Sequence, residues 1–323
     1  MKTIPLFDAH CDTASAARDS GQGLRRNTLH TDLERGRDFA PYAQVFAVWA
    51  DGGVPGAEAR CEAILTFLET EIRREAERVT LCRDGAELRR AAAEHKIAAM
   101  ISIEGAEQIG CSEERLRAVY ARGVRVVNPC WNYDNALCGA AVNLRRGPNG
   151  AWEPGPSGGG LTARGREFVR AAQTLGVAVD SSHMSEAAFW DAAGIAEKPL
   201  IASHSNARAL CGHPRNLSDA QFQAIAKMGG AVGVNLVPDF LEESGKADLY
   251  TVFKHIEHFL SLDGTRTVCL GGDLDGTDDL PRGFAGIGDY AALYELLLRE
   301  NYGEALVRDI FYNNLLSYFE RAL

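Results

Sequence analysis

The amino-acid sequence predicts an α/β fold, a (β/α)₈ barrel that forms a single domain over residues 1–323. Short runs of apolar and β-branched residues alternate along the chain with longer segments whose apolar residues recur at helical spacing. This alternation is typical of a parallel sheet whose strands are connected by helices. The short runs number eight, as many as the strands that close a barrel.

The predicted strands are four to seven residues long: Pro5–His10, Ala43–Trp49, Ile97–Ile103, Val124–Asn128, Val177–Asp180, Leu200–Ser203, Ala231–Leu236 and Thr267–Gly271. The predicted helices are Ala59–Val79, Arg115–Arg122, Thr162–Leu175, Ser185–Ala193, Asp219–Lys227, Thr251–Leu262, Asp289–Arg299 and Glu304–Ala322. Ser112, Ser185 and Ser218 stand where three of these helices begin, and serine is a favoured N-cap residue.

Residues 139–160 interrupt this alternation of predicted strands and helices. The segments Arg145–Gly150 and Gly155–Gly160 contain too much glycine and proline for the interior of a helix or strand. We therefore predict a long βα loop. On the catalytic face of a barrel such a loop would serve as a lid or a binding loop, and a merely flexible insertion is the alternative.

The net charge of −10 and the pI near 5.4 argue against nucleic acid as a partner, because binding to phosphates needs clustered Lys and Arg. The start of the chain has no apolar signal region, and no segment approaches the roughly 18 apolar residues that span a bilayer. We expect no membrane partner and a cytoplasmic location, and leave open a homodimer. The eight cysteines form no Cys-x-x-Cys pair, so we expect reduced thiols rather than disulfides.

Polar and ionisable residues gather at the carboxyl ends of the predicted strands, which form the active face of a barrel. They are His10, Asp12, Glu104, Asn132, His183, His204 and Asp273. Residues two apart in an extended segment point to the same side, so His10 and Asp12 can both bind one metal ion. His183 and His204 follow neighbouring strands, and neutral imidazoles are natural zinc ligands. The sequence therefore predicts a metal site.

Glu104 ends an apolar strand, where an isolated charge is costly to bury. It is either a helix N-cap or surface acid, or a carboxylate that bridges two metal ions. Charge counting agrees with the bridge: two divalent ions carry four positive charges, while Asp12, Glu104, Asp273 and a hydroxide supply four negative ones.

The eighth strand leads into Gly271-Gly272-Asp273-Leu274-Asp275-Gly276. Either Asp273 or Asp275 could carry a proton during catalysis. We favour Asp273 because it lies nearer the strand end. An acidic turn without catalytic function is the alternative.

In the order and spacing of its motifs, the sequence resembles the renal (membrane) dipeptidase family, peptidase family M19, a branch of the amidohydrolase-like metal-dependent hydrolases. The motifs are Asp8-Ala9-His10-Cys11-Asp12, Ser102-Ile103-Glu104-Gly105, Gly160-Leu161-Thr162, Asp180-Ser181-Ser182-His183, Ser203-His204-Ser205-Asn206-Ala207, Arg215-Asn216 and Gly271-Gly272-Asp273-Leu274-Asp275-Gly276.

The resemblance implies a zinc-dependent metallo-dipeptidase with two Zn²⁺ ions as its cofactors and a dipeptide as its substrate. It implies that His10 and Asp12 hold one zinc, that His183 and His204 hold the other, and that Glu104 bridges them. Asp273 would then contact the bridging water. Arg215 matches the arginine that receives the terminal carboxylate of the substrate in this family, a task suited to a planar guanidinium.

The sequence departs from the animal members of the family at two places. Asn132 stands where those members carry a substrate-contacting histidine, and the segment Asn235-Leu236-Val237 lacks their pocket tyrosine. An amide can still donate to an oxyanion, so Asn132 is retained as a substrate-binding residue. Both departures bear on substrate preference more than on the reaction.

The expected reaction is attack of a metal-bridging hydroxide on the peptide carbonyl, with Asp273 transferring the proton to the leaving amine. The same ligands would permit hydrolysis of another small amide, such as an N-acyl amino acid or a lactam. A non-catalytic metal-binding barrel is a rival of another class. Asp273 argues against it, because a scaffold has no use for a proton carrier.

Overall fold

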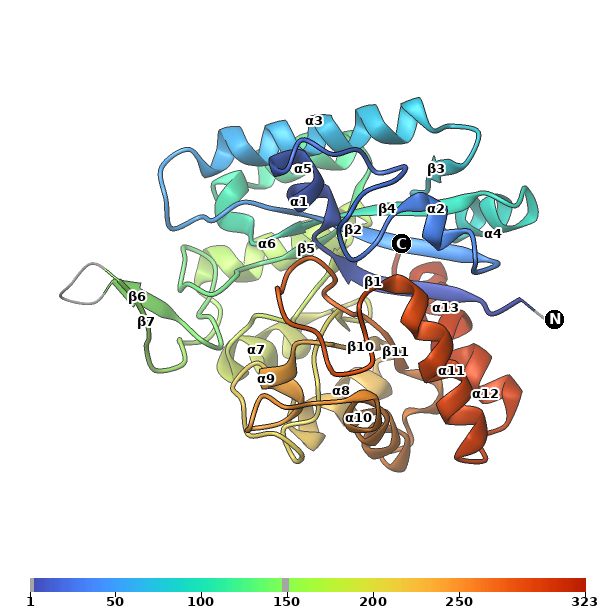
Figure 1. Cartoon of the computed structure of the whole chain (residues 1–323). Coiled ribbons are helices and arrows are strands. Elements are labelled where there is room, and N and C mark those ends of the chain that lie inside the picture. Colours follow the sequence, from blue (N-terminus) through green and yellow to red (C-terminus); the bar gives the residue numbers. More distant parts are fainter. Residues whose placement is uncertain (1–2, 147–150) are drawn as a thin grey trace.

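The computed structural model describes residues 3–146 and 151–323 (Figure 1). Eight parallel strands stand side by side in the order β8 (Ala178–Val179), β5 (Val124–Asn128), β4 (Ile97–Glu104), β2 (Tyr42–Trp49), β1 (Leu6–Cys11), β11 (Val268–Leu270), β10 (Ala231–Val234) and β9 (Ile201–Ala202). A parallel bridge between Asp180, directly after β8, and Ile201 in β9 joins the two ends of this order. The sheet thereby forms the predicted (β/α)₈ barrel, and each predicted strand overlaps one of its strands.

Helices surround the strands, as the sequence predicts (Figure 1). They are α1 (Thr13–Asp19), α2 (Leu33–Gly36), α3 (Ala57–Arg74), α4 (Gly85–Ala93), α5 (Glu113–Ala121), α6 (Ala163–Leu175), α7 (Glu186–Ile195), α8 (Asp219–Lys227), α9 (Pro238–Leu241), α10 (Leu249–Ser261), α11 (Tyr290–Arg299), α12 (Glu304–Arg308) and α13 (Asn314–Ala322). The predicted caps Ser112, Ser185 and Ser218 each accept a hydrogen bond from a backbone N–H in the first turn of α5, α7 and α8.

Two predicted helices differ from the observed elements. The segment predicted as Ala59–Val79 leaves the helix at Arg74 and ends in the short strand β3 (Val79–Leu81), which pairs with β4. The segment predicted as Glu304–Ala322 is divided by a π-helical turn at Asp309–Asn313. In the first case pairing with a neighbouring strand overrides the helical pattern, because β-branched and apolar residues suit a sheet.

The predicted loop over residues 139–160 contains an antiparallel hairpin. Its strands are β6 (Leu144–Arg146) and β7 (Trp152–Pro154), and the hairpin projects from the barrel in Figure 1. Residues 147–150 of the predicted loop lie outside the described residues.

The amino-terminal end of the barrel is filled by apolar side chains from the strands and from α13. Phe7 of β1 and Phe319 of α13 are fully buried, and their rings stack with centroids 5.6 Å apart. Val45, Met100 and Leu315 belong to the same buried cluster. The polar residues stand at the carboxyl ends of the strands and therefore converge at the opposite end of the barrel.

All eight cysteines are buried and carry free thiols, which agrees with the predicted reduced state. Among the helices of residues 3–146 and 151–323, none combines the length and the apolar character that crossing a bilayer requires.

Candidate metal centre

The end of β1 is shaped by the buried carboxylate of Asp8. It accepts hydrogen bonds from the backbone N–H of His10 (2.9 Å), the backbone N–H of Gly272 (3.1 Å) and the hydroxyl of Tyr290 (2.5 Å). The register between β1 and β2 shifts between Asp8 and Cys11. This irregular end of β1 places His10 and Asp12 at the carboxyl-terminal face, with His10 fully buried.

His10, Asp12 and Glu104 form one group that could hold a metal ion. The Nε2 atom of His10 lies 3.3 Å from Asp12 Oδ2 and 3.3 Å from Glu104 Oε2. His10 Nε2 and Asp12 Oδ1 are buried, yet neither makes a well-formed hydrogen bond to any described residue. Buried polar atoms are normally satisfied, so these orphaned atoms fit a cation between them.

Glu104, His183 and His204 form a second group. Glu104 Oε1 lies 2.9 Å from His183 Nε2 and 3.6 Å from His204 Nε2, and the two Nε2 atoms are 3.0 Å apart. Glu104 thus directs Oε1 to this group and Oε2 to His10, which is the arrangement of a carboxylate that bridges two ions. The structure brings together the five side chains that the sequence predicts as ligands.

The pKa shifts in this cluster arise from burial and from neighbouring charges. Burial and the charge of Arg215 together lower the pKa of His183 to about 4. Burial also lowers the pKa of His204, so both imidazoles are neutral and can offer a lone pair. Burial and the charge of Glu104 raise the pKa of Asp12 to about 8. Without a cation, part of Asp12 is therefore protonated at neutral pH, and a bound cation would favour its ionised form.

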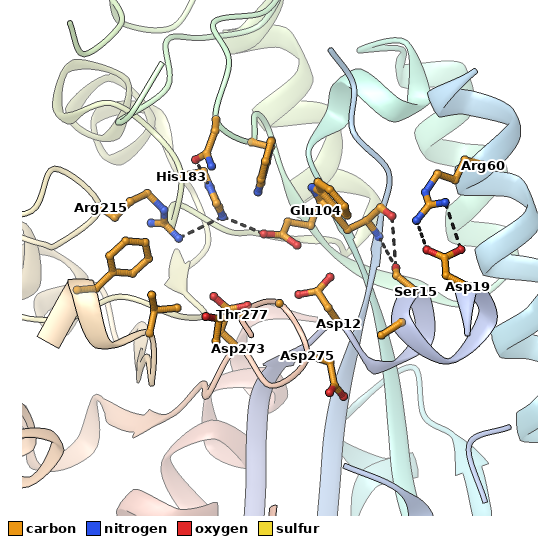
Figure 2. Close-up of a pocket in the computed structure, with 17 residues that line it drawn as sticks. Asp12, Ser15, Asp19, Arg60, Glu104, His183, Arg215, Asp273, Asp275 and Thr277 are labelled. Carbon is orange, nitrogen blue, oxygen red and sulfur yellow. Dashed lines mark hydrogen bonds and ion pairs between the residues drawn. The ribbon is translucent and has the colours of Figure 1, made fainter. Parts of the chain in front are cut away.

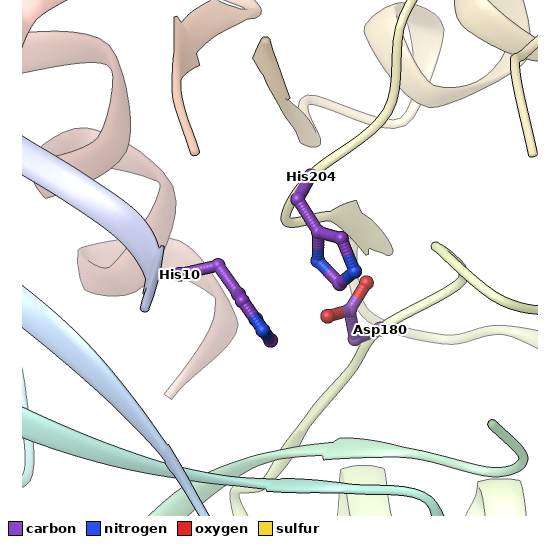
Figure 3. Close-up of side chains that lie close together, drawn as sticks. All are labelled: His10, Asp180 and His204. Carbon is purple, nitrogen blue, oxygen red and sulfur yellow. The ribbon is translucent and has the colours of Figure 1, made fainter. Parts of the chain in front are cut away.

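A third group combines His10, Asp180 and His204. Figure 3 shows the Asp180 carboxylate lying beside the His204 ring. Asp180 Oδ1 already accepts hydrogen bonds from the Ser182 backbone N–H (3.0 Å), the Ser182 hydroxyl (2.7 Å) and the Ser203 backbone N–H (3.0 Å). This carboxylate is satisfied by the protein, unlike that of Asp12.

Asp273 and Asp275 differ in where they point. Asp273 Oδ1 lies 3.9 Å from His10 Nε2, and its Oδ2 accepts a hydrogen bond from the Asn235 amide (3.1 Å). Asp275 accepts hydrogen bonds from the Thr13 hydroxyl and from the His30 backbone N–H. Figure 2 shows Asp273 beside the Glu104 and Asp12 carboxylates and Asp275 directed away from them. Burial and the charge of Glu104 raise the pKa of Asp273, so its carboxylate is a suitable proton acceptor.

Arg215 is buried beside the second group. Its Nη2 lies 3.1 Å from His183 Nε2, and its Nη1 is buried without a hydrogen-bond partner among the described residues. Asn132 Oδ1 lies 2.9 Å from His183 Nδ1, so Asn132 contacts a predicted ligand as well as the pocket. A buried guanidinium with an unused donor fits an anionic group in the pocket.

A cavity of about 330 Å³ lies over the two groups. Arg215 and Phe240 line one part of it, and the ion pair of Asp19 and Arg60 lines another part (Figure 2). Glu104 lies between these parts in the view. The cavity can therefore hold a small ligand across the predicted metal ions.

A family model for membrane dipeptidases, peptidase family M19, matches residues 1–322. The chain belongs to this family. A protein from the pqqA 5′ region of Klebsiella pneumoniae is 36% identical over 257 residues, which cover 78% of this chain and 92% of the Klebsiella protein.

Solved structures of the dipeptidase family have the same fold. A metallopeptidase from Rhodobacter sphaeroides, liganded with a phosphinate mimic of L-Ala-D-Ala, matches with a TM-score of 0.88 at 28% identity, and the match covers all of both chains. The dipeptidase AC matches with a TM-score of 0.87 at 30% identity over 99% of both chains. The protein described here is thus a metallo-dipeptidase of the M19 family.

Several pocket residues of this dipeptidase do not follow from the sequence analysis. Trp49, Trp131 and Phe240 provide apolar walls, and Asp19 and Arg60 come from the helices α1 and α3. Among these residues, only Trp49 could have been expected at the pocket from the sequence, because it ends a predicted strand. Val237 lines the pocket in the segment where the animal members carry a tyrosine.

Proposed function

We propose that this chain hydrolyses the peptide bond of dipeptides at a pair of zinc ions held by His10, Asp12, Glu104, His183 and His204. The observation that carries the proposal is the position of Glu104, whose two carboxylate oxygens face two separate groups of ligands. Histidine nitrogen and carboxylate oxygen atoms are the donors that catalytic zinc sites use. When bound, the zinc pair would supply a nucleophilic water of lowered pKa and would polarise the peptide carbonyl.

Asp273 is the proton carrier in this proposal. Asn235 holds Oδ2 through a hydrogen bond, which leaves Oδ1 directed toward the ligand cluster. Burial raises the pKa of Asp273, and this makes its carboxylate a better proton acceptor. The same carboxyl group can then donate that proton to the leaving amine.

Arg215 binds the terminal carboxylate of the substrate. Its buried Nη1 is unused, and a guanidinium binds a carboxylate strongly when water is excluded. A carboxylate bound by Arg215 would lie close to the predicted ligand His183, so the scissile bond would be near the carboxyl end of the substrate. This position favours short substrates, and the dipeptide mimic bound to the Rhodobacter relative supports dipeptides. Asn132 would bind the substrate from the His183 side of the pocket.

The test is release of free amino acids from a panel of L,L and L,D dipeptides by the zinc-loaded protein. N-acyl amino acids and lactams belong in the panel, because the same centre could hydrolyse them. We expect Asp273→Asn to lower kcat by about 10²–10⁴-fold, the usual contribution of a general acid or base.

Asp275→Asn is the matched control. Both aspartates have a positive φ, 57° for Asp273 and 68° for Asp275, a conformation that asparagine tolerates. We expect Asp275→Asn to retain most activity, since Asp275 faces Thr13 and His30. Cleavage of no dipeptide by zinc-loaded, folded protein would exclude the proposed substrate class, and equal losses in the two variants would exclude the proposed role of Asp273.

A further inference from the structure

The hydroxyl of Ser203 lies between the two groups of predicted ligands. Ser203 Oγ is 2.7 Å from His204 Nδ1 and 3.5 Å from His10 Nδ1. It also donates a short hydrogen bond to Asp180 Oδ2. Asp180, Ser203, His204 and His10 are all at most 1% exposed, so water does not compete for these contacts.

The hydrogen-bonding capacity of a hydroxyl fixes the direction of each contact. A serine hydroxyl has one proton to donate and two lone pairs that accept. An ionised carboxylate can only accept, so the Ser203 proton goes to Asp180. Both lone pairs of Ser203 Oγ are then left to accept from the imidazoles. His204, at 2.7 Å, must therefore carry a proton on Nδ1, and the longer contact of 3.5 Å favours the same tautomer for His10.

A neutral imidazole with a proton on Nδ1 has its lone pair on Nε2. The Nε2 atoms are the ones that face the predicted ions. His204 Nε2 lies 3.6 Å from Glu104 Oε1, and His10 Nε2 lies 3.3 Å from Glu104 Oε2. The contacts of Ser203 thus leave the metal-facing nitrogen of each ring free of a proton.

We propose that the Asp180–Ser203 pair is a positioning element that sets the tautomer and ring orientation of two ligands, one in each metal group. The inference rests on the proposed metal ligation. Asp180 accordingly acts through Ser203 and is not itself a ligand, although it lies close enough to His10 and His204 to form a third candidate group. One buried hydroxyl thereby serves both ions, while Asn132 contacts the Nδ1 atom of His183.

Asp180→Asn gives a sharp test, because it keeps the shape of the side chain and reverses one hydrogen bond. The amide oxygen can still accept the three contacts of Oδ1, while the amide nitrogen replaces Oδ2 and donates to Ser203. The Ser203 proton must then point to His204 Nδ1, which moves the ring proton to Nε2, the metal-facing atom. Ser203→Ala is the second variant, since it removes the shared hydroxyl.

Ser181→Ala is the matched control. Ser181 is 3% exposed, and its hydroxyl donates a buried hydrogen bond to the Ile201 carbonyl (3.0 Å) without contacting a histidine. This variant loses a buried serine hydroxyl and one hydrogen bond in the same part of the barrel. It therefore reports any general effect on stability.

The first measurement is ¹⁵N NMR of the metal-free protein labelled at histidine, with His204→Gln and His10→Gln to assign the signals. We expect a protonated Nδ1 and a bare Nε2 for His204 in the wild type and in Ser181→Ala. In Asp180→Asn we expect the His204 proton on Nε2. A wild-type His204 that carries its proton on Nε2, or an unchanged tautomer in Asp180→Asn, would overturn the inference.

The second measurement is the zinc dissociation constant, obtained by competition with a chromophoric chelator. We expect Asp180→Asn and Ser203→Ala to weaken zinc binding by about 10–100-fold, as loss of a residue that orients a ligand does. Ser181→Ala should bind zinc like the wild type. Unchanged affinity in both variants would refute the positioning role and leave the proposed dipeptidase reaction standing. Absence of dipeptide cleavage by zinc-loaded wild type would refute that reaction and leave the positioning role standing.

Discussion

Arg215 is the buried side chain that we propose to set the length of the substrate. Its guanidinium has one nitrogen beside His183 and another without a partner among the described residues. We expect Arg215→Met to raise KM for dipeptides by about 10–100-fold, because a hydrogen bond to a charged group contributes about 1.5–3 kcal/mol. The measurement is the ratio of KM values for the variant and the wild type.

Dipeptide amides provide the control for Arg215, because they lack the terminal carboxylate. The wild type and Arg215→Met should cleave them with similar kcat/KM. A KM for ordinary dipeptides that stays at the wild-type value in Arg215→Met would show that the carboxylate binds elsewhere.

His255 makes the fold sensitive to acid at a distance from the metal centre. Its Nδ1 accepts a hydrogen bond from the Ala207 backbone N–H (3.1 Å), and its Nε2 donates to the Leu241 carbonyl (2.8 Å). Burial is the main cause that lowers the pKa of His255 from 6.5 to about 4; the hydrogen bond to Leu241 opposes this shift and His258 adds to it. The folded protein therefore keeps this ring neutral.

The sign of the pH effect follows from proton binding. Between pH 6.5 and about pH 4 the unfolded chain binds a proton on His255 that the folded protein does not bind. His255 consequently destabilises the fold as the pH falls through this window, and its contribution is fully retained above pH 6.5. NMR titration of the His255 ring should show an apparent pKa near 4, whereas titration near 6.5 would contradict the prediction.

At the scale of elements, α13 is the helix that closes the end of the barrel opposite the metal centre. Phe319 is fully buried and stacks on Phe7 of β1. We expect Phe319→Ala to lower the free energy of unfolding by about 3–5 kcal/mol, because it leaves a cavity in the core. Urea denaturation checks the value.

Tyr250→Ala is the control for Phe319→Ala, since Tyr250 is 46% exposed and its loss should change stability by less than about 0.5 kcal/mol. The folded Phe319→Ala protein should bind zinc with wild-type affinity, because α13 does not reach the ligands. A destabilisation as small as that of Tyr250→Ala would show that α13 is not part of the barrel core.

The elements also show what the sequence could predict. The eight barrel strands carry compact apolar runs, so their positions follow from local pattern. Strand β3 is not predicted, because the helical spacing of apolar residues continues to Val79 and the pairing of Val79–Leu81 with β4 is a tertiary contact. The hairpin of β6 and β7 is not predicted either, because glycine and proline around it favour a loop.

The same limit applies to the site. The predicted ligands stand at strand ends, where barrel geometry brings them together. Asp19 and Arg60 come from two helices whose approach depends on packing, and the role of Asp180 depends on the direction of one hydroxyl proton. These arrangements arise from tertiary contacts rather than from spacing along the chain.

At the scale of the whole molecule, the predicted ligands tie together strands that are distant in sequence. His10 lies near the end of β1, Glu104 ends β4, and His204 follows β9. Metal bound to all of them should stabilise the folded barrel, since a ligand of the native state shifts the folding equilibrium by mass action. We expect zinc to raise Tm by several degrees in the wild type and much less in Glu104→Gln, measured by scanning calorimetry of protein stripped with a chelator. Equal shifts in the two proteins would place the zinc elsewhere.

The burial of all eight thiols makes the intact barrel inert toward alkylating reagents. Burial raises the pKa of Cys61 in α3 and of Cys82 after β3 to about 12, so little reactive thiolate forms at either residue. Labelling by iodoacetamide would therefore proceed only when a segment opens. The cysteines are distributed from residue 11 to residue 269. The rate at which each one is labelled, measured by mass spectrometry, would therefore report how often its part of the barrel opens.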